Sequence, residues 1–189
     1  MTLLHIRPLP KPRSNLRNRW LWCAAIGLAV ITFLVAACGS GNEAKAPDFR
    51  LTQFDGSEFR LSGQSEENLV VLNFWYPTCT PCREEMPSFE AAWQLFQAEE
   101  VIVEFLGIFV SQGFDSEQDA RDFVSELGLT YGFATDIGAR VAEMFQIEAY
   151  PTTVFIDDSG RVFKTFVSGL DEEELVSMVR EMAGGRTGG

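Results

Sequence analysis

Histidine and cysteine are scarce in this chain, which has one histidine, His5, and four cysteines among its 189 residues. A zinc site needs about four nitrogen or sulfur ligands, and His5, Cys23 and Cys38 all lie before residue 39. The other two cysteines are Cys79 and Cys82. They are too few for a metal centre or for the disulfide framework of a small secreted domain. We therefore expect no metal, and a fold held together by its apolar core.

Acidic residues are absent from residues 1–37, which carry five of the 15 basic residues of the chain. Residues 38–189 therefore contain ten basic residues against 27 acidic ones, a net charge of −17. A surface this acidic repels the phosphates of nucleic acids and the headgroups of anionic lipids. We expect no nucleic-acid partner and no membrane binding that depends on charge.

The N-terminal segment has the organisation of an export signal. A basic head is followed by the apolar run Trp20–Ala37, and the run ends in Val-Ala-Ala before Cys38. This ending resembles the bacterial lipobox, in which cleavage precedes the cysteine and the sulfur of Cys38 would carry lipid. The alternative is an uncleaved anchor, since 18 residues are close to the minimum for crossing a bilayer. Both interpretations place the remainder outside a bacterial cytoplasmic membrane.

Composition then divides the chain into four parts. We expect a signal peptide or membrane anchor over residues 1–37 and a flexible tether, small and polar, over residues 38–46. A folded domain should occupy residues 47–183, and a disordered tail residues 184–189.

The pattern of apolar residues predicts an α/β domain with a mixed sheet flanked by helices. Two alternating runs around Asp55-Gly56 predict a β-hairpin, and a polar loop should follow over 62–68. The expected strands are 69–75, 101–110, 131–135, 153–157 and 161–167. The expected helices are about 79–97, 116–127, 137–145 and 170–182, and the third should turn Val141, Met144 and Phe145 inward.

The chemistry is concentrated in residues 69–87, where a fully apolar run leads into Cys79-Thr80-Pro81-Cys82 and a helix-forming sequence. Residues i and i+3 share one face of a helix, so the two sulfurs can form a disulfide. Free amides at the start of a helix favour a thiolate, which is the attacking species. We expect Cys79, nearer the tip, to attack and Cys82 to resolve. Half of a zinc site and a purely structural bridge are the alternatives.

These motifs together resemble the thioredoxin superfamily, and more specifically the TlpA/ResA-type membrane-anchored thiol–disulfide oxidoreductases. The resemblance covers residues 47–183. It rests on Phe74-Trp75, the C-x-x-C pair, Pro87 five residues later, and Tyr150-Pro151-Thr152 before a strand. The hairpin at 49–61 and the extra helix and strand at 116–135 also match this group.

The resemblance implies a thioredoxin-like fold, no cofactor, and a cis peptide bond before Pro151. It implies a substrate-binding surface formed by Trp75, Thr80, Pro81, Tyr150 and Pro151. Thioredoxin has an acidic residue where this chain has Asn73, which leaves Glu85 as the candidate proton shuttle for Cys82. Thr78 stands where many relatives have tryptophan.

The family further implies protein disulfide or dithiol substrates, a membrane electron donor, and a role in cytochrome c maturation or envelope thiol homeostasis. We expect a monomer. Two other functions stay open at this point. One is a peroxiredoxin-like thiol peroxidase, suggested by Pro77-Thr78-Cys79, although its site spaces these residues differently. The other is a tethered binding module with a static disulfide.

Overall fold

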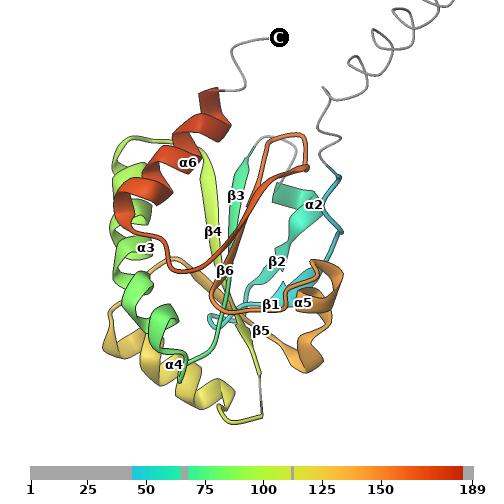
Figure 1. Ribbon diagram of the computed structural model, residues 1–189, viewed down its shortest axis with the longest axis vertical. Helices are drawn as coiled ribbons and strands as arrows, with labels where there is room; N and C mark the ends of the chain where they lie inside the picture. The colour runs from blue at the N-terminus through green and yellow to red at the C-terminus, as the bar shows by residue number, and fades with distance from the viewer. Residues whose placement is uncertain (1–43, 65–67, 112, 185–189) are drawn as a thin grey trace, which may run out of the picture. The chain divides into compact units, whose positions relative to one another are not determined.

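Five strands form a mixed sheet in the order β5-β4-β3-β6-β7 (Figure 1). The computed structural model describes residues 44–64, 68–111 and 113–184. β3 pairs in parallel with β4, as does β4 with β5, whereas β6 is antiparallel to both β3 and β7. The predicted α/β fold with a mixed sheet is therefore confirmed. The strands are β3 (Leu69–Trp75), β4 (Val103–Val110), β5 (Gly132–Asp136), β6 (Thr152–Ile156) and β7 (Val162–Val167).

β3 is the central strand, and all seven of its residues are buried. Successive side chains of a strand point to opposite faces, and the core is accordingly divided into two clusters. One contains Val71 and Trp75 with the inner sides of three helices, and the other contains Val70, Leu72 and Phe74. Burial on both faces explains why the strand is apolar throughout rather than alternating.

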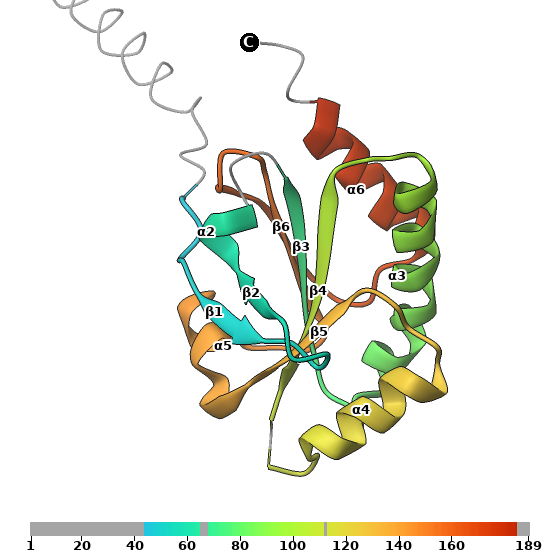
Figure 2. The same ribbon diagram turned by 180° about the vertical axis from the view of Figure 1, so that it is seen from behind.

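Helices α3 (Thr80–Ala98), α4 (Glu117–Glu126) and α6 (Glu172–Gly184) cover one face of the sheet (Figures 1 and 2). The hairpin of β1 (Arg50–Thr52) and β2 (Glu58–Arg60) covers the other face together with α5 (Arg140–Met144). The hairpin has the predicted antiparallel pairing, with Leu51 opposite Phe59. α3 buries Met86, Phe89, Ala92 and Phe96 in one stripe, as its helical spacing predicts.

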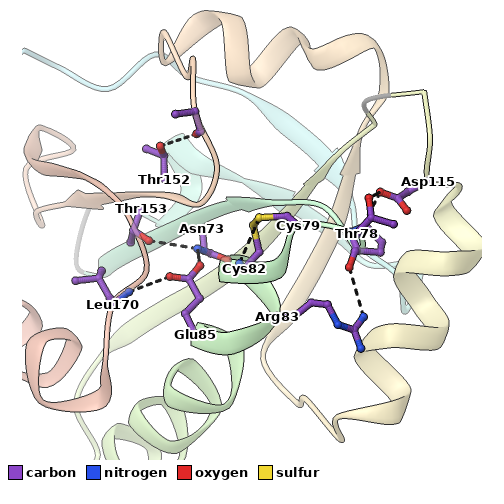
Figure 3. Close-up of a disulfide and its surroundings, with 12 residues drawn as sticks. Asn73, Thr78, Cys79, Cys82, Arg83, Glu85, Asp115, Thr152, Thr153 and Leu170 are labelled. Carbon is purple, nitrogen blue, oxygen red and sulfur yellow. Dashed lines mark hydrogen bonds between the residues drawn. A yellow bond between two sulfur atoms is a disulfide. The ribbon is translucent and has the colours of Figure 1, made fainter.

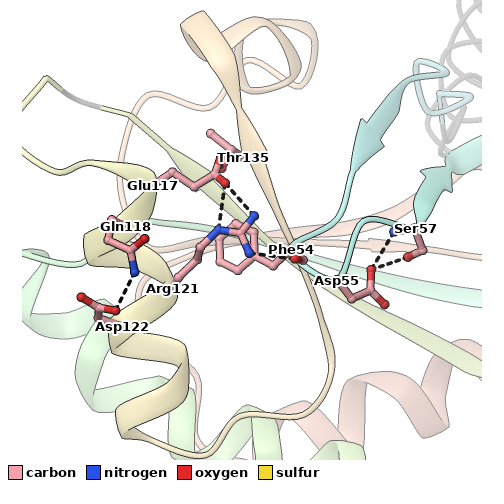
Figure 4. A network of polar contacts seen from close by, with 8 residues as sticks. All are labelled: Phe54, Asp55, Ser57, Glu117, Gln118, Arg121, Asp122 and Thr135. Carbon is pink, nitrogen blue, oxygen red and sulfur yellow. Dashed lines mark hydrogen bonds and ion pairs between the residues drawn. The ribbon is translucent and has the colours of Figure 1, made fainter.

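Arg121 on α4 joins the hairpin to the rest of the domain (Figure 4). Its guanidinium lies 4.4 Å from the centre of the Phe54 ring and donates to the Phe54 carbonyl at 2.7 Å. The same group pairs with Glu117 at 2.7 Å, and the other Glu117 oxygen accepts from Thr135 on β5. One arginine thus links the hairpin, α4 and the sheet edge.

Ser116 and Asp119 form a capping box at the start of α4. Ser116 is the N-cap, its hydroxyl accepts from the Asp119 amide, and the Asp119 carboxylate accepts from the Ser116 amide. Such reciprocal pairs satisfy two of the amides that a helix start leaves free. At the other end, Gly128 has a φ of +64°, a conformation that suits glycine after a helix.

Two expectations about helices were wrong. The polar segment expected to be a loop begins with the short helix α2 (Leu61–Gln64). Met144 is 44% exposed rather than inward, and Ala142 is buried beside Val141 instead. The reason is that the predicted continuous helix breaks: a 3-10 turn, η1 (Ile137–Ala139), contains residues with positive φ and resets the buried face of α5.

The edges of the folded domain also differ from the prediction. Ala46 is buried and donates to the Gly160 carbonyl at 2.9 Å, and Lys45 forms a bridge with Arg161. The last residues of the expected tether, 44–46, therefore belong to the fold. Gly184 is the last residue of α6 rather than the first of a tail.

The expected signal or anchor at 1–37, with Cys23 and Cys38, lies outside the described residues, as does the tail from 185. In the parts of the chain that the structure describes, no helix combines the length and the apolar character needed to cross a membrane.

Gly107 offers a test of the packing around β4. A Cβ at this position would lie 2.5 Å from two ring carbons of Phe133 and 3.2 Å from the Trp75 indole nitrogen. Gly107→Ala should therefore lower the free energy of unfolding by about 1–3 kcal/mol, because overpacking forces neighbours out of place. Urea unfolding followed by tryptophan fluorescence measures the change.

Gly63→Ala is the matched control, because a Cβ at Gly63 in α2 would meet no atom within 4 Å. It should be neutral or stabilising by up to about 1 kcal/mol, since alanine favours helix. Equal free energies of unfolding for Gly107→Ala and the wild type would contradict this view of the core.

Candidate active site

The disulfide Cys79–Cys82 lies where β3 ends and α3 begins (Figure 3). Cys79 is the N-cap residue of α3, with extended backbone, and its Sγ accepts from the Cys82 amide at 3.3 Å. Pro81 occupies the first turn, where its missing N–H removes no helical hydrogen bond. The predicted bridge across one helical turn is present, with 5.3 Å between the two Cα atoms.

The two cysteines differ in their access to solvent. Cys79 is 4% exposed and Cys82 is fully buried, whereas Thr80 and Pro81 between them are exposed. A large partner can thus reach this pair only from the side of Cys79. The structure supports the expectation that Cys79 is the outer and Cys82 the inner sulfur.

A cis peptide bond joins Tyr150 to Pro151, as expected. Its place follows from the register of the sheet, because Thr152 on β6 pairs with Phe74 on β3. The residues before Thr152 therefore lie beyond the end of β3, beside the segment that leads to Cys79. The rings of Tyr76 and Tyr150 meet edge to face at 5.4 Å across this junction.

Glu85 is buried on α3, three residues after Cys82, and is 4% exposed. Its Oε1 accepts from the Asn73 amide at 2.8 Å, and its Oε2 accepts from the backbone N–H of Leu170 at 3.1 Å (Figure 3). Burial disfavours the charged form and raises the pKa of Glu85 to about 7, against the opposing effect of these two hydrogen bonds. A carboxyl with this pKa can give and take a proton near neutral pH.

Asn73, the residue on β3 that hydrogen-bonds Glu85, contacts a second strand as well. Its amide nitrogen also lies 3.2 Å from the Thr153 hydroxyl on β6, and the side chain is 1% exposed. The Asn73 Oδ1 has no hydrogen-bond partner among the described residues. Asn73 therefore positions the Glu85 carboxyl.

Trp75 does not lie on the substrate surface, contrary to expectation. It is fully buried and packs against Phe109, Phe123 and Phe133, with ring centroids 5.4–6.0 Å apart. The residue falls on the last position of β3, on the face that the helices cover, so its ring supports the site from within the core. Thr80, Pro81 and Tyr150 lie at least partly exposed around the disulfide.

Two contacts beside the pair were not predicted. The Thr78 hydroxyl donates to the Asp115 carboxylate (Figure 3). The Arg83 guanidinium lies over the Phe123 ring. Sequence spacing gives no sign of a contact between residues 37 positions apart. Among the described residues, no three histidine, cysteine or acidic side chains gather so that they could hold a metal ion.

Comparison with known proteins agrees with this geometry. The model of the AhpC/TSA family matches residues 43–165. The thiol-disulfide oxidoreductase ResA of Geobacillus kaustophilus is 30% identical over 153 residues, which are 80% of this chain and 84% of that protein. The thioredoxin-like protein YneN of Bacillus subtilis is 28% identical, over 76% and 82% of the two chains.

Solved structures share the fold. The crystal structure of StoA from Bacillus subtilis superposes with a TM-score of 0.63, at 19% identity, over 71% of this chain and 97% of that chain. The thioredoxin-like fold expected from the sequence is confirmed.

Glu85 should make stability depend on pH in a defined direction. Its pKa is about 7 in the folded chain and ordinarily 4.5, so the folded state binds the proton more tightly. The resulting stabilisation is complete below pH 4.5 and is lost as the pH rises towards 7 and above. Between pH 4.5 and 7.5 the wild type should lose about 3 kcal/mol of unfolding free energy relative to Glu85→Gln.

Urea unfolding of the oxidised full-length chain over this pH range measures the loss. Glu84→Gln is the matched control, since Glu84 is the exposed neighbouring residue on the same helix, and its pH profile should follow that of the wild type. Parallel profiles for the wild type and Glu85→Gln would show that Glu85 titrates in its ordinary range.

Proposed function

Because the chain belongs to the AhpC/TSA family and is a thiol–disulfide oxidoreductase of the ResA type, we propose that Cys79 and Cys82 exchange disulfides with proteins outside the bacterial cytoplasmic membrane. The observation that carries the proposal is the position of the pair. Its outer sulfur caps α3 and lies beside the cis-proline loop.

The exchange proceeds in two steps. The Cys79 thiolate attacks a substrate disulfide, forms a mixed disulfide and releases one substrate thiolate. The Cys82 thiolate then attacks the Cys79 sulfur, which closes the bridge and releases the second substrate thiolate. Two electrons pass from the protein to the substrate, and a dithiol donor must restore the reduced pair. The reverse sequence oxidises a substrate dithiol.

Glu85 is the residue that we assign to the proton of Cys82. It lies one turn further along α3, on the same buried stripe, and its raised pKa keeps it partly protonated near pH 7. It can accept the Cys82 proton as that thiol becomes the nucleophile in the second step. The hydrogen bonds from Asn73 and Leu170 hold the carboxyl on this side of the helix.

The substrate surface consists of Thr80, Pro81 and Tyr150, whereas Pro151 is itself buried and shapes the loop beside them. We expect an extended substrate segment to lie along this loop beside the disulfide. In this arrangement a substrate cystine reaches Cys79, and Cys82 stays covered until the mixed disulfide has formed.

The proposed location rests on the N-terminal sequence. A basic head, an apolar run and Cys38 favour a lipoprotein over a single-span anchor, with residues 38–43 as a tether to the folded domain. We propose that the protein works there as a monomer. A membrane-bound thiol donor would supply its electrons. Proteins whose cysteines must be reduced before haem attachment, or other envelope thiols, are the substrates we propose.

A thiol peroxidase is less well supported. The peroxidase site spaces its proline and its hydroxyl residue further ahead of the attacking cysteine than Pro77 and Thr78 stand here. We therefore assign the pair to disulfide exchange. We expect the wild type to consume hydrogen peroxide no faster than the Cys79→Ser variant does.

Cysteine variants test the assignment of roles. Cys79→Ser should abolish the reduction of insulin disulfides, because it removes the attacking sulfur. Cys82→Ala should accumulate substrates bound to Cys79, because nothing resolves the mixed disulfide, and mass spectrometry of the non-reduced adducts identifies them. The Cys79→Ser, Cys82→Ala double variant is the control and should capture none. Insulin reduction by Cys79→Ser would reject the proposed function.

Lipidation tests the proposed location. In cells fed an alkyne-labelled fatty acid, the wild type should carry label and remain in the membrane fraction. Cys38→Ser should lose both the label and signal-peptide cleavage, whereas Cys23→Ser should keep them, because Cys23 lies inside the apolar run. Label that persists in Cys38→Ser would exclude the lipobox interpretation.

A further inference from the structure

Asp115 is a buried carboxylate fixed to the residue directly before Cys79. It is 8% exposed and immediately precedes the N-cap of α4. One of its oxygens accepts from the Thr78 hydroxyl at 2.8 Å and from the Thr78 backbone N–H at 3.3 Å (Figure 3). Burying a carboxylate costs free energy unless hydrogen bonds replace its water, and here Thr78 supplies two of them.

A second set of contacts with α4 holds the residue that follows Cys82. Arg83 follows Cys82 directly, and its guanidinium lies 4.3 Å from the centre of the Phe123 ring on α4. It also donates to the Pro77 carbonyl at 3.4 Å and lies 3.9 Å from the Glu126 carboxylate. The start of α4 and its inner face thus hold the residues that flank both cysteines.

We propose that Asp115 is a positioning residue for Cys79, and that its negative charge opposes ionisation of the Cys79 thiol. The Asp115 carboxylate holds Thr78, and through it the backbone that presents the sulfur at the start of α3. A negative charge in contact with Thr78, the residue next to Cys79, works against the helix amides, which favour the thiolate. The proposal rests on the assignment of Cys79 as the attacking sulfur.

The effect on the redox equilibrium follows from the same charge. The reduced pair is more stable when its thiolate is stabilised, and a stabilised thiolate makes a disulfide a stronger oxidant. Asp115 therefore shifts the pair towards a better reductant. This suits an enzyme that reduces its substrates.

Other ionisable groups lie on the segments around the pair and must be held constant in a test. Arg83 and Glu85 come from α3, and Glu126 on α4 pairs with Arg83. Tyr76 comes from the loop before Cys79 and Tyr150 from the cis-proline loop. A substitution at Asp115 leaves all of these side chains in place.

The test measures the Cys79 thiol itself. The reduced full-length chain is alkylated with iodoacetamide over a range of pH, and the rate is followed on the Cys79 peptide by mass spectrometry. Asp115→Asn removes the charge but keeps an oxygen that can accept from Thr78. It should lower the pKa of Cys79 by about half a unit, seen as about threefold faster alkylation below that pKa.

Asp136→Asn is the matched control. Asp136 is another buried carboxylate, and it accepts from two amides at the start of α5. Its substitution removes the same charge from a different helix start and should leave the alkylation profile of Cys79 unchanged. An unchanged or raised pKa of Cys79 in Asp115→Asn would overturn the electrostatic part of the proposal.

Asp115→Ala tests positioning, because it also removes the acceptor. At a pH where Cys79 is fully ionised, Asp115→Asn should reduce insulin disulfides nearly as fast as the wild type, and Asp115→Ala about tenfold more slowly. Equal rates for the two variants would overturn the positioning role. Should Asp115→Ala fail to fold, Thr78→Val replaces it, because this substitution removes the donor of the shorter hydrogen bond to Asp115. A rate of insulin reduction by Thr78→Val equal to that of the wild type would likewise overturn the positioning role. The alkylation profile is independent of turnover, so it stays informative if insulin is not reduced.

Discussion

The free amides at the start of α3 are the constraint on which the rest of this structure depends. The central strand β3, buried on both faces, ends at Trp75. Three residues then turn the chain, and Cys79 is the N-cap of the next helix. Its sulfur accepts the Cys82 N–H, so the group that will carry charge lies where the helix dipole favours a negative charge. The remaining features of the site either cover this sulfur or adjust its ionisation.

Three segments that are distant in sequence complete the site. Antiparallel pairing of β6 with β3 brings the cis-proline loop to the end of β3. Leu170, two residues before α6, donates its backbone N–H to Glu85. Asp115, the residue before the N-cap of α4, supplies the carboxylate that holds Thr78. Two buried acids consequently lie on opposite sides of the disulfide. Glu85 is placed to move a proton for Cys82, and we have proposed that Asp115 adjusts Cys79.

Local patterns predicted much of this structure. The apolar run of β3 and the hairpin around Asp55-Gly56 each depend on neighbours a few residues away, and both were confirmed. Even the burial of Glu85 could be predicted, because it lies four residues before Phe89 on the same helical stripe. The errors arose where helical periodicity was extended through a break, as at Met144.

The contacts that local patterns could not predict are those between elements. The family resemblance placed Trp75 on the substrate surface, but the parity of β3 turns its side chain towards the helices. The link between Asp115 and Thr78 depends on how α4 packs against the loop before α3, and no spacing in the sequence encodes that distance.

The central claim is that the Cys79–Cys82 bridge opens and closes as the protein works. Equilibrating the full-length chain in buffers of defined thiol–disulfide potential, and counting the oxidised fraction of the pair by mass spectrometry, tests it directly. We predict a reversible two-electron transition between about −270 and −120 mV, the range of known catalytic pairs. A bridge that stays closed below about −300 mV would be a structural disulfide and would contradict the account.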